Sequence, residues 1–268
     1  MKSVEPGDPV LLSYYSCSSC VQCQESHPSY CDVFAVENYI GRQQRVSIRQ
    51  GDKEETPWTR FFAQSSFAQY SVVDQASIVN AKNLLHSQDE LKLFAPLGCG
   101  FQTGMGAILN TSCAGPADVV MILGLGAVGM GALMVSNRPS FTHSAYIVLT
   151  DSGQTSHIQG CKAIIAVDKF QDRLELSRTL GATHTINTTS PDFTTLSEAA
   201  RAYFPAGVSI VIETTGVPFL IEQGLEATHA RGKLVCIGVP PVRYNMGVDM
   251  IKHINVGTPF SFRGGLTV

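Results

Sequence analysis

Four cysteines lie close together near the start of the 268-residue chain, in the spacing C-x2-C-x2-C-x7-C: Cys17, Cys20, Cys23 and Cys31. Four thiolates this close in sequence can surround one tetrahedral ion. Zinc binds thiolates at about 2.3 Å in closed sites that leave no position for a substrate. The spacing therefore predicts a structural zinc lobe over residues 17–31. Two disulfides, or four unrelated buried cysteines, are the alternatives.

The first residues of the chain argue against disulfides. Residues 1–8 contain no apolar stretch of the kind that a secretory signal requires. Disulfides persist in oxidising compartments, whereas clustered cysteines in an intracellular chain favour a metal site. We therefore expect a cytoplasmic protein with a zinc lobe.

The charge of the chain excludes two classes of partner. Its net charge is −3, with 15 % charged residues, so it carries no electrostatic footprint for nucleic acid or for an anionic membrane. The longest apolar region, residues 119–134, contains four glycines and is typical of a strand, a turn and a helix rather than of a membrane span. We expect no nucleic acid and no membrane among the partners.

The pattern of apolar and polar residues changes at about residue 96. Residues 1–95 contain short strand signals, at 10–14 and at the alternating segment 67–73, separated by Pro, Asn and Gly. Beyond them, apolar strands alternate with helical patterns, which predicts a parallel sheet covered on both faces, in a doubly wound α/β (Rossmann) domain of six strands. The expected strands are 119–123, 163–167, 183–187, 208–212, 233–238 and 260–266, and the expected helices are 171–180, 191–204 (capped by Ser190) and 218–230. Two domains follow, over residues 1–95 and 96–268.

A glycine-rich turn follows the first of these strands. Its sequence is G-x-G-x-x-G, formed by Gly124, Gly126 and Gly129, with Ala127 and Val128 between the last two. In this context, after a strand and opening a helix, the first glycine permits the tight turn, the second lets a pyrophosphate approach the backbone, and the third allows helix and strand to pack closely. The turn therefore predicts a dinucleotide site. A packing turn without a ligand is the alternative.

An acid ends the second strand of the expected sheet. Asp168 is placed to accept hydrogen bonds from the adenosine ribose, and its charge repels a 2′-phosphate, which favours NAD over NADP. Lys169 and Arg173 follow it and are further candidates for cofactor contact, although a cation near this point can also accommodate a phosphate. The alternative is a solvated acid at a strand end.

The distance between the turn and the acid is too long. Gly124 and Asp168 are 44 residues apart, whereas about 20 are expected. The extra segment is expected near residues 135–157, where Pro139 should end the helix early. One hypothesis is a retained intron, since Val135-Ser136 can be encoded by GTGAG or GTAAG and Gln159 by CAG. The other is a genuine surface insertion.

The chain resembles the zinc-containing medium-chain alcohol dehydrogenases, closest to the aryl- and benzyl-alcohol branch. The motifs that carry the resemblance are FFAQSSFA at 61–68, APLGCGFQTG at 95–104 and IGVPP at 237–241. The resemblance implies a partial GroES-like, mainly β catalytic domain before the Rossmann domain. It also implies that the four-cysteine lobe holds a structural zinc, that Cys99 is a ligand of a catalytic zinc, that Thr103 lies against the nicotinamide, and that the backbone at Val239 meets its amide.

The resemblance implies an activity and an assembly as well. An open zinc lowers the pKa of a bound alcohol, and the alkoxide passes a hydride to NAD, so the substrate is a primary, aryl alcohol or the matching aldehyde. Members of the family commonly self-associate through the last strand of the nucleotide domain, here residues 260–266.

The chain departs from this family pattern at its start. The family's other catalytic-zinc ligands, a cysteine and a His-Glu pair, lie N-terminal to the structural lobe, and the sixteen residues before Cys17 contain neither Cys nor His. Three protein ligands are the norm for catalytic zinc, so Cys99 alone makes an incomplete site. We therefore expect either a dehydrogenase whose sequence is truncated at both ends, or a catalytically silent zinc- and NAD-binding fragment or misassembled gene product.

Overall fold

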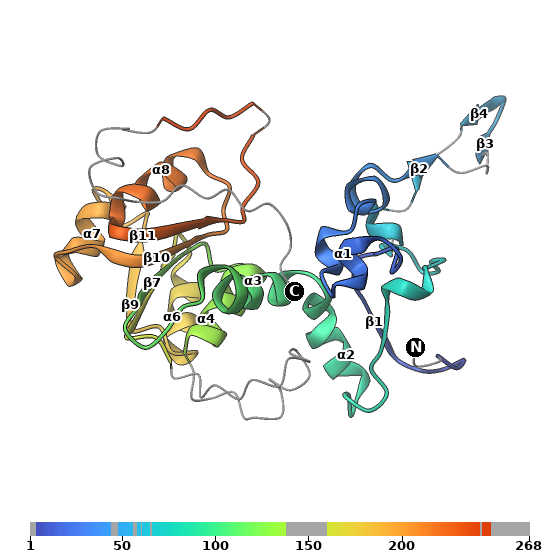
Figure 1. Ribbon diagram of the computed structural model, residues 1–268, viewed down its shortest axis with the longest axis horizontal. Helices are drawn as coiled ribbons and strands as arrows, with labels where there is room; N and C mark the ends of the chain where they lie inside the picture. The colour runs from blue at the N-terminus through green and yellow to red at the C-terminus, as the bar shows by residue number, and fades with distance from the viewer. Residues whose placement is uncertain are drawn as a thin grey trace. The chain divides into compact units, whose positions relative to one another are not determined.

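The computed structural model describes residues 4–43, 48–55, 58–59, 61–64, 66–137, 160–241 and 243–247. The chain forms two compact units, Met1–Cys99 and Gly100–Val268 (Figure 1). The expected strand at 260–266 and most of the expected extra segment lie outside the described residues. Within these ranges, no helix combines the length and the hydrophobicity that a bilayer crossing requires.

The first unit is made of short elements. The strand expected at 10–14 is present as β1 (Val10–Leu12), which pairs antiparallel with β6 (Ile78–Asn80). Two more antiparallel pairs follow the cysteine lobe: β2 (Arg42–Gln43) with β5 (Trp58–Thr59), and β3 (Ile48–Gln50) with β4 (Lys53–Glu55). The helical elements are α1 (Val21–Gln24), η1 (Pro28–Tyr30), η2 (Val36–Ile40), η3 (Phe61–Ala63), η4 (Gln75–Ser77), α2 (Gln88–Phe94) and η5 (Ala95–Gly98).

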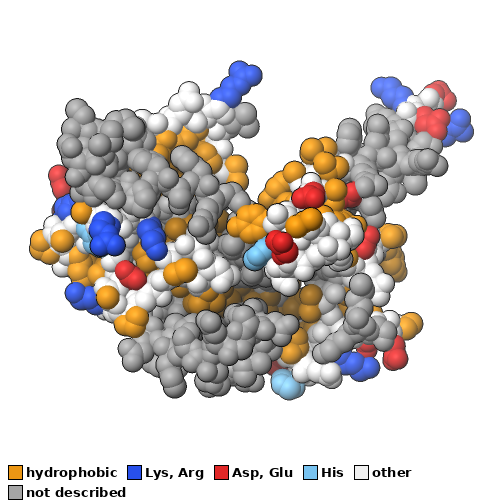
Figure 2. All heavy atoms as spheres, in the orientation of Figure 1, with side chains coloured by type: hydrophobic (Ala, Val, Ile, Leu, Met, Phe, Trp, Pro, Cys, Tyr) orange, Lys and Arg blue, Asp and Glu red, His pale blue; other side chains and the backbone are white. Residues whose placement is uncertain are grey.

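The prediction of a strand at 67–73 is wrong. The segment contains bends and no strand, and Phe67, Tyr70 and Val72 are each at least 86 % exposed. Alternation predicts a strand only where one face packs on a partner layer, and no strand of the described residues pairs with this segment. Other hydrophobic side chains also reach the surface in the view of Figure 2.

The second unit contains a five-stranded sheet in the order β11-β10-β7-β8-β9, in which every pair is parallel. Its strands are β7 (Val119–Leu123), β8 (Ala163–Asp168), β9 (His184–Asn187), β10 (Val208–Glu213) and β11 (Thr228–Cys236). Counted along the chain, this order is 3-2-1-4-5 from the β9 edge, which is the order of a Rossmann sheet. The five strands expected within the described residues are confirmed. Strand β11 begins at Thr228, before the expected residue 233, and its pairing with β10 changes register between Val208 and Ile210.

Helices cover both faces of this sheet (Figure 1). Residues of β7 alternate between two buried clusters, with Val120 and Ile122 in one and Met121 and Leu123 in the other. The first cluster contains residues of α3 (Gly100–Gly106), η6 (Ala107–Ser112), α4 (Ala127–Ser136) and α6 (Gln171–Thr179). The second contains residues of α7 (Leu196–Tyr203) and α8 (Pro218–Ala227). Burial on both faces explains why the central strands β7 and β8 are almost entirely apolar.

The start of α7 differs from the expectation. Ser190 and Pro191 were expected to open the helix, but it begins at Leu196 and its N-cap is Thr195, whose Oγ1 accepts the Glu198 N–H at 3.1 Å. The sequence T-x-x-E at this point is a capping box. By contrast, the expected stop of α6 is confirmed, because Gly181 follows it with φ +109°.

Helix α4 extends further than the expected extra segment allows. It includes Val135 and Ser136, which are 3 % and 1 % exposed, and the backbone N–H of Cys161 donates to the Ser136 carbonyl at 2.9 Å. These two residues therefore belong to the packed domain, and the extra segment begins after them rather than at 135. A retained intron with its border at Val135 would place two core residues of α4 in the intron.

Candidate functional site

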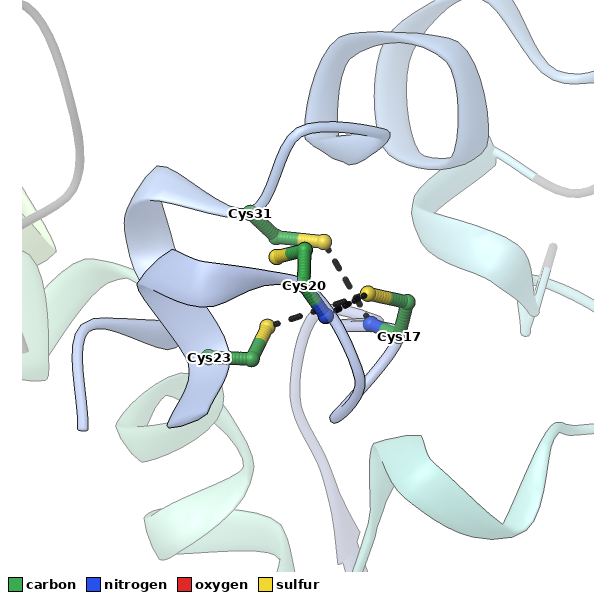
Figure 3. A group of neighbouring side chains, drawn as sticks. All are labelled: Cys17, Cys20, Cys23 and Cys31. Atoms are coloured by element: carbon green, nitrogen blue, oxygen red, sulfur yellow. Dashed lines mark hydrogen bonds between the residues drawn. The ribbon is translucent and has the colours of Figure 1, made fainter. Parts of the chain in front are cut away.

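The four cysteines of the lobe converge (Figure 3). Cys20 directly precedes α1, Cys23 lies within it, Cys17 lies before it, and Cys31 follows η1. All four Sγ atoms lie within 4.8 Å of one another, and those of Cys17 and Cys23 are 4.0 Å apart. Tetrahedral thiolates at about 2.3 Å from one ion stand about 3.8 Å apart. The cluster thus has nearly the dimensions of a closed four-thiolate zinc site.

The surroundings of the cluster favour the thiolate form of Cys17 and the thiol form of Cys23. Hydrogen bonds from the Ser19 hydroxyl and from the backbone N–H groups of Ser19 and Cys20 lower the pKa of Cys17 to about 6. Burial, together with the neighbouring thiols, raises the pKa of Cys23 to about 12. A divalent cation removes this opposition, because it binds thiolates and deprotonates a coordinating thiol outright. The donor set therefore fits zinc.

The glycine turn joins β7 to α4. Gly124 has φ +89°, and a Cβ added at Gly129 would lie 1.8 Å from the Gly124 carbonyl oxygen, so both positions require glycine for turn geometry and close packing. Gly126 has no such requirement, since its φ is −76° and no atom lies within 4 Å of an added Cβ. The open space beside Gly126, at the exposed start of a ten-residue helix, is the cradle that a pyrophosphate would fill.

Asp168 lies at the end of β8, beside this turn. Its Oδ2 accepts the Leu125 N–H at 2.7 Å and its Oδ1 accepts the Phe170 N–H at 2.9 Å, and the residue is 7 % exposed. A carboxylate has about four acceptor positions, so two bonds leave capacity for ribose hydroxyls. Asp168 therefore fixes the turn and remains able to bind the adenosine ribose.

Two cations flank the aromatic ring that follows this acid. Lys169 Nζ lies 5.0 Å and Arg173 Cζ lies 4.8 Å from the centroid of the Phe170 ring, which is 45 % exposed. Arg173 Nη1 is also 3.7 Å from Asp168 Oδ2. The structure thus places Asp168, Lys169 and Arg173 at one end of β8.

Helix α3 carries Thr103 and packs directly on α4. A Cβ added at Gly104 would lie 1.9 Å from the Val128 carbonyl oxygen, and one at Gly131 would lie 2.6 Å from the Phe101 carbonyl oxygen. The two helix backbones therefore touch, which fixes α3 to the helix that opens at the glycine turn.

Cys99 lies one residue before α3, in the first unit, and is exposed. The preceding turn, η5, packs on β1, since a Cβ at Gly98 would lie 1.7 Å from the Leu12 carbonyl oxygen. Among the described residues, the four cysteines of the lobe are the sole group of three or more side chains arranged to hold a metal, and Cys99 is not part of it. The described residues therefore do not fit a complete catalytic zinc site.

Val239 lies beyond β11 and is 89 % exposed. Beside it lies a loop that the sequence analysis missed, Thr214 to Gly216, which follows β10: a Cβ at Gly216 would lie 2.4 Å from the Val239 carbonyl oxygen. Glu213, at the end of β10, is completely buried and accepts hydrogen bonds from this loop. An acid that ends an apolar strand and precedes T-T-G was the signal that could have found it.

Comparisons with known proteins agree with this architecture. A family model described as zinc-binding dehydrogenase matches residues 152–262. A probable alcohol dehydrogenase from a Pseudomonas species is 29 % identical over 90 % of this chain and 68 % of its own length. The crystal structures of a zinc-binding-domain alcohol dehydrogenase protein from Burkholderia ambifaria and of benzyl alcohol dehydrogenase from Acinetobacter calcoaceticus each match 96 % of this chain, at 32 % identity and a TM-score of 0.73. These similarities support placing the chain with the zinc-containing medium-chain alcohol dehydrogenases.

The chain spans less than two thirds of the length of several of the relatives that it matches. It covers 62 % of each of the two crystal structures and 58 % of a geraniol dehydrogenase from Castellaniella defragrans, to which it is 29 % identical. The shared fold accounts for the Rossmann sheet and the glycine turn.

Proposed function

We propose that this chain is a zinc- and NAD-binding polypeptide of an alcohol dehydrogenase, whose reaction is hydride transfer between a primary alcohol and NAD. The observation that carries the proposal is the open space at Gly126, a position where neither backbone conformation nor packing requires glycine. A dinucleotide explains that glycine, and Asp168 supplies the acid that a Rossmann site places on the ribose.

The residues of this chain would bind and orient the cofactor. Gly124, Gly126 and Gly129 shape the turn, and the N–H groups at Ala127 and Val128 begin the helix that attracts the pyrophosphate. When bound, NAD supplies the hydride acceptor. Asp168, with Lys169 and Arg173 beside it, holds the adenosine half, and Thr103 and the backbone at Val239 are the candidates for contact with the nicotinamide.

The metal assignment has two parts. Cys17, Cys20, Cys23 and Cys31 hold a structural zinc, on the strength of their convergence. Cys99 is the candidate ligand of a catalytic zinc, but one thiolate is short of the three protein ligands that such a site needs. This shortfall favours a second function, a catalytically silent protein that keeps the structural zinc and the cofactor.

The remaining assignments rest on the resemblance. The first 95 residues correspond to part of a GroES-like catalytic domain, and residues 96–268 to the nucleotide domain. Benzyl alcohol dehydrogenase is the named activity of one structural relative, so an aryl alcohol or aldehyde is the first substrate to test. Cytoplasmic location and self-association through residues 260–266 complete the proposal, and light scattering on the purified chain measures the latter.

Three measurements on the purified chain test these readings together: zinc per chain, NADH affinity by fluorescence titration, and NADH formation with benzyl alcohol. One zinc with NADH binding and no turnover supports the silent protein. Two zincs with turnover support the dehydrogenase. A folded, zinc-loaded chain that does not bind NADH overturns both.

A further inference from the structure

The buried carboxylate of Glu213 belongs neither to the cysteine lobe nor to the glycine turn. Glu213 is the last residue of β10 and is 0 % exposed. Its Oε1 accepts the Thr215 N–H at 2.6 Å and the Gly216 N–H at 3.0 Å, and it also accepts the Thr215 hydroxyl. Among the described residues, no basic side chain forms an ion pair with it. A buried charge held in this way needs its N–H and O–H donors.

All of these donors come from one loop, Thr214 to Gly216. The strand itself is held by other bonds, since the Glu213 backbone carbonyl accepts the Ile237 N–H at 2.8 Å and the Thr214 N–H donates to the Leu123 carbonyl at 3.0 Å. The carboxylate of Glu213 therefore fixes the loop rather than the sheet.

This loop fills the space between the glycine turn and the segment after β11. On one side, the Thr214 hydroxyl donates to the Leu123 carbonyl at 2.8 Å and lies 3.1 Å from the Gly124 carbonyl oxygen. On the other side, a Cβ at Gly238 would lie 2.1 Å from the Gly216 nitrogen. A shift of the loop therefore moves both Gly124 and Val239.

The strand order places this loop on one half of the cofactor. Asp168, the ribose acid, ends β8 on one side of β7, whereas Glu213 ends β10 on the other side. A dinucleotide that crosses the carboxyl edge with its pyrophosphate at the glycine turn has its adenosine on the β8 side. Its nicotinamide half therefore runs past the loop that Glu213 holds.

We infer that Glu213 is a positioning residue for the nicotinamide half of the cofactor, acting through the loop Thr214–Gly216. The inference rests on the proposed NAD binding. It predicts an effect that a general loss of packing does not produce: removing the carboxylate weakens binding of the whole dinucleotide and leaves binding of its adenosine half unchanged.

The test compares NADH with AMP as ligands of the purified full chain, by calorimetric titration, with thermal melting recorded alongside. Glu213→Met keeps the length of the side chain and removes its acceptors, and Glu213→Gln keeps an oxygen at the Oε1 position. Glu222→Gln is the matched control, because Glu222 lies on α8 and accepts the Tyr244 hydroxyl at 2.8 Å.

We expect Glu213→Met to weaken NADH about tenfold or more, with AMP affinity unchanged, and Glu213→Gln to restore NADH affinity to within about threefold of the natural chain. If Glu213→Met does not fold, Thr215→Val, which removes the hydroxyl bond to Glu213, replaces it with the same expectation. Provided that the natural chain binds NADH, two results for Glu213→Met overturn the inference: an equal loss of affinity for NADH and AMP, or no loss of affinity for either. A natural chain that binds neither ligand overturns the proposed function instead.

Discussion

The Asp168 carboxylate accepts a hydrogen bond from the backbone N–H of Leu125 at 2.7 Å, across 43 residues of sequence. The acid that ends β8 therefore also holds the turn that ends β7. The proposed contact with the cofactor and the geometry of the turn therefore share one side chain, and substitutions can separate the two effects.

Asp168→Asn keeps one oxygen, which can accept the Leu125 N–H, gives up the bond from the Phe170 N–H, and removes the charge that repels a 2′-phosphate. Arg173, whose Nη1 is 3.7 Å from Asp168 Oδ2 in the natural chain, supplies a cation for that phosphate. We expect the ratio of NADPH to NADH affinity to rise by about tenfold, the equivalent of about 1.4 kcal/mol. Fluorescence titration with each cofactor measures this ratio. The control is Asp172→Asn, at an acid four residues after Asp168. An unchanged ratio would contradict the role of Asp168.

Two alanine substitutions in the glycine turn should have opposite effects. Gly126→Ala places a methyl group in open space, so we expect unchanged unfolding in urea and NADH binding weakened by about tenfold. Gly129→Ala brings a Cβ to 1.8 Å from the Gly124 carbonyl and should destabilise the fold by about 2–3 kcal/mol. A Gly126→Ala protein that binds NADH normally would show that no ligand approaches there.

Loss of one lobe cysteine should remove the zinc. Cys31 is 4 % exposed and its Sγ accepts the Cys17 N–H at 3.3 Å, so Cys31→Ser should reduce the content from one structural zinc to none and lower the melting temperature. Cys113→Ser, at an exposed cysteine outside the cluster, is the control. Bound zinc should also be released as the pH falls, because protons compete for the thiolates. Elemental analysis after dialysis measures both effects, and full zinc content in Cys31→Ser would refute the site.

Deletion of residues 138–159 should leave the nucleotide domain folded. The Ser136 carbonyl already accepts the Cys161 N–H at 2.9 Å. Joining Asn137 to Gly160 would turn this contact into the i to i+3 hydrogen bond of a β-turn with Asn-Gly at its centre, a favoured turn sequence. We expect the deleted protein to melt within a few degrees of the full chain and to bind NADH equally well.

Aggregation of the deleted protein, or loss of NADH binding, would show that the segment is part of the domain. Sequencing of the transcript addresses its origin separately. A mature message that always carries the segment rejects the retained intron.

Thr195→Ala should cost about 1 kcal/mol of unfolding free energy, since it removes the N-cap of α7. Ser190→Ala, at the cap expected from sequence, should cost less than half as much. Chemical denaturation measures the loss of unfolding free energy in each variant. A larger loss for Ser190→Ala than for Thr195→Ala would indicate that the helix begins at Ser190.

The centre of the sheet could be predicted because burial on both faces makes β7 and β8 nearly continuous apolar runs. Residues 119–123 and 163–167 needed no partner information, since each run is bounded by polar or glycine residues. The stop of α6 was equally local, because Gly181 adopts a positive φ that few other residues tolerate.

The errors came from signals that depend on the surroundings. Alternation at 67–73 carried no information about a partner layer, and Phe67 lies in solvent. At α7, the Ser190-Pro191 pair favoured a start that the structure does not use, because the helix begins after Thr195, whose side chain caps the Glu198 N–H. The role of Glu213 depends on the loop folding back over its carboxylate, so the acid before T-T-G marks the position in the sequence but does not specify these contacts.

Ser136 and Cys161 meet beside the start of β8, and the neighbouring Lys162 N–H donates to Asp118 just before β7. These points lie at the amino ends of the strands, whereas Gly124 and Asp168 lie at the carboxyl ends. Residues can therefore be inserted or deleted at this junction without altering the carboxyl ends of the strands, where the glycine turn and Asp168 lie. The junction is accordingly a suitable place to graft an affinity tag or a reporter domain.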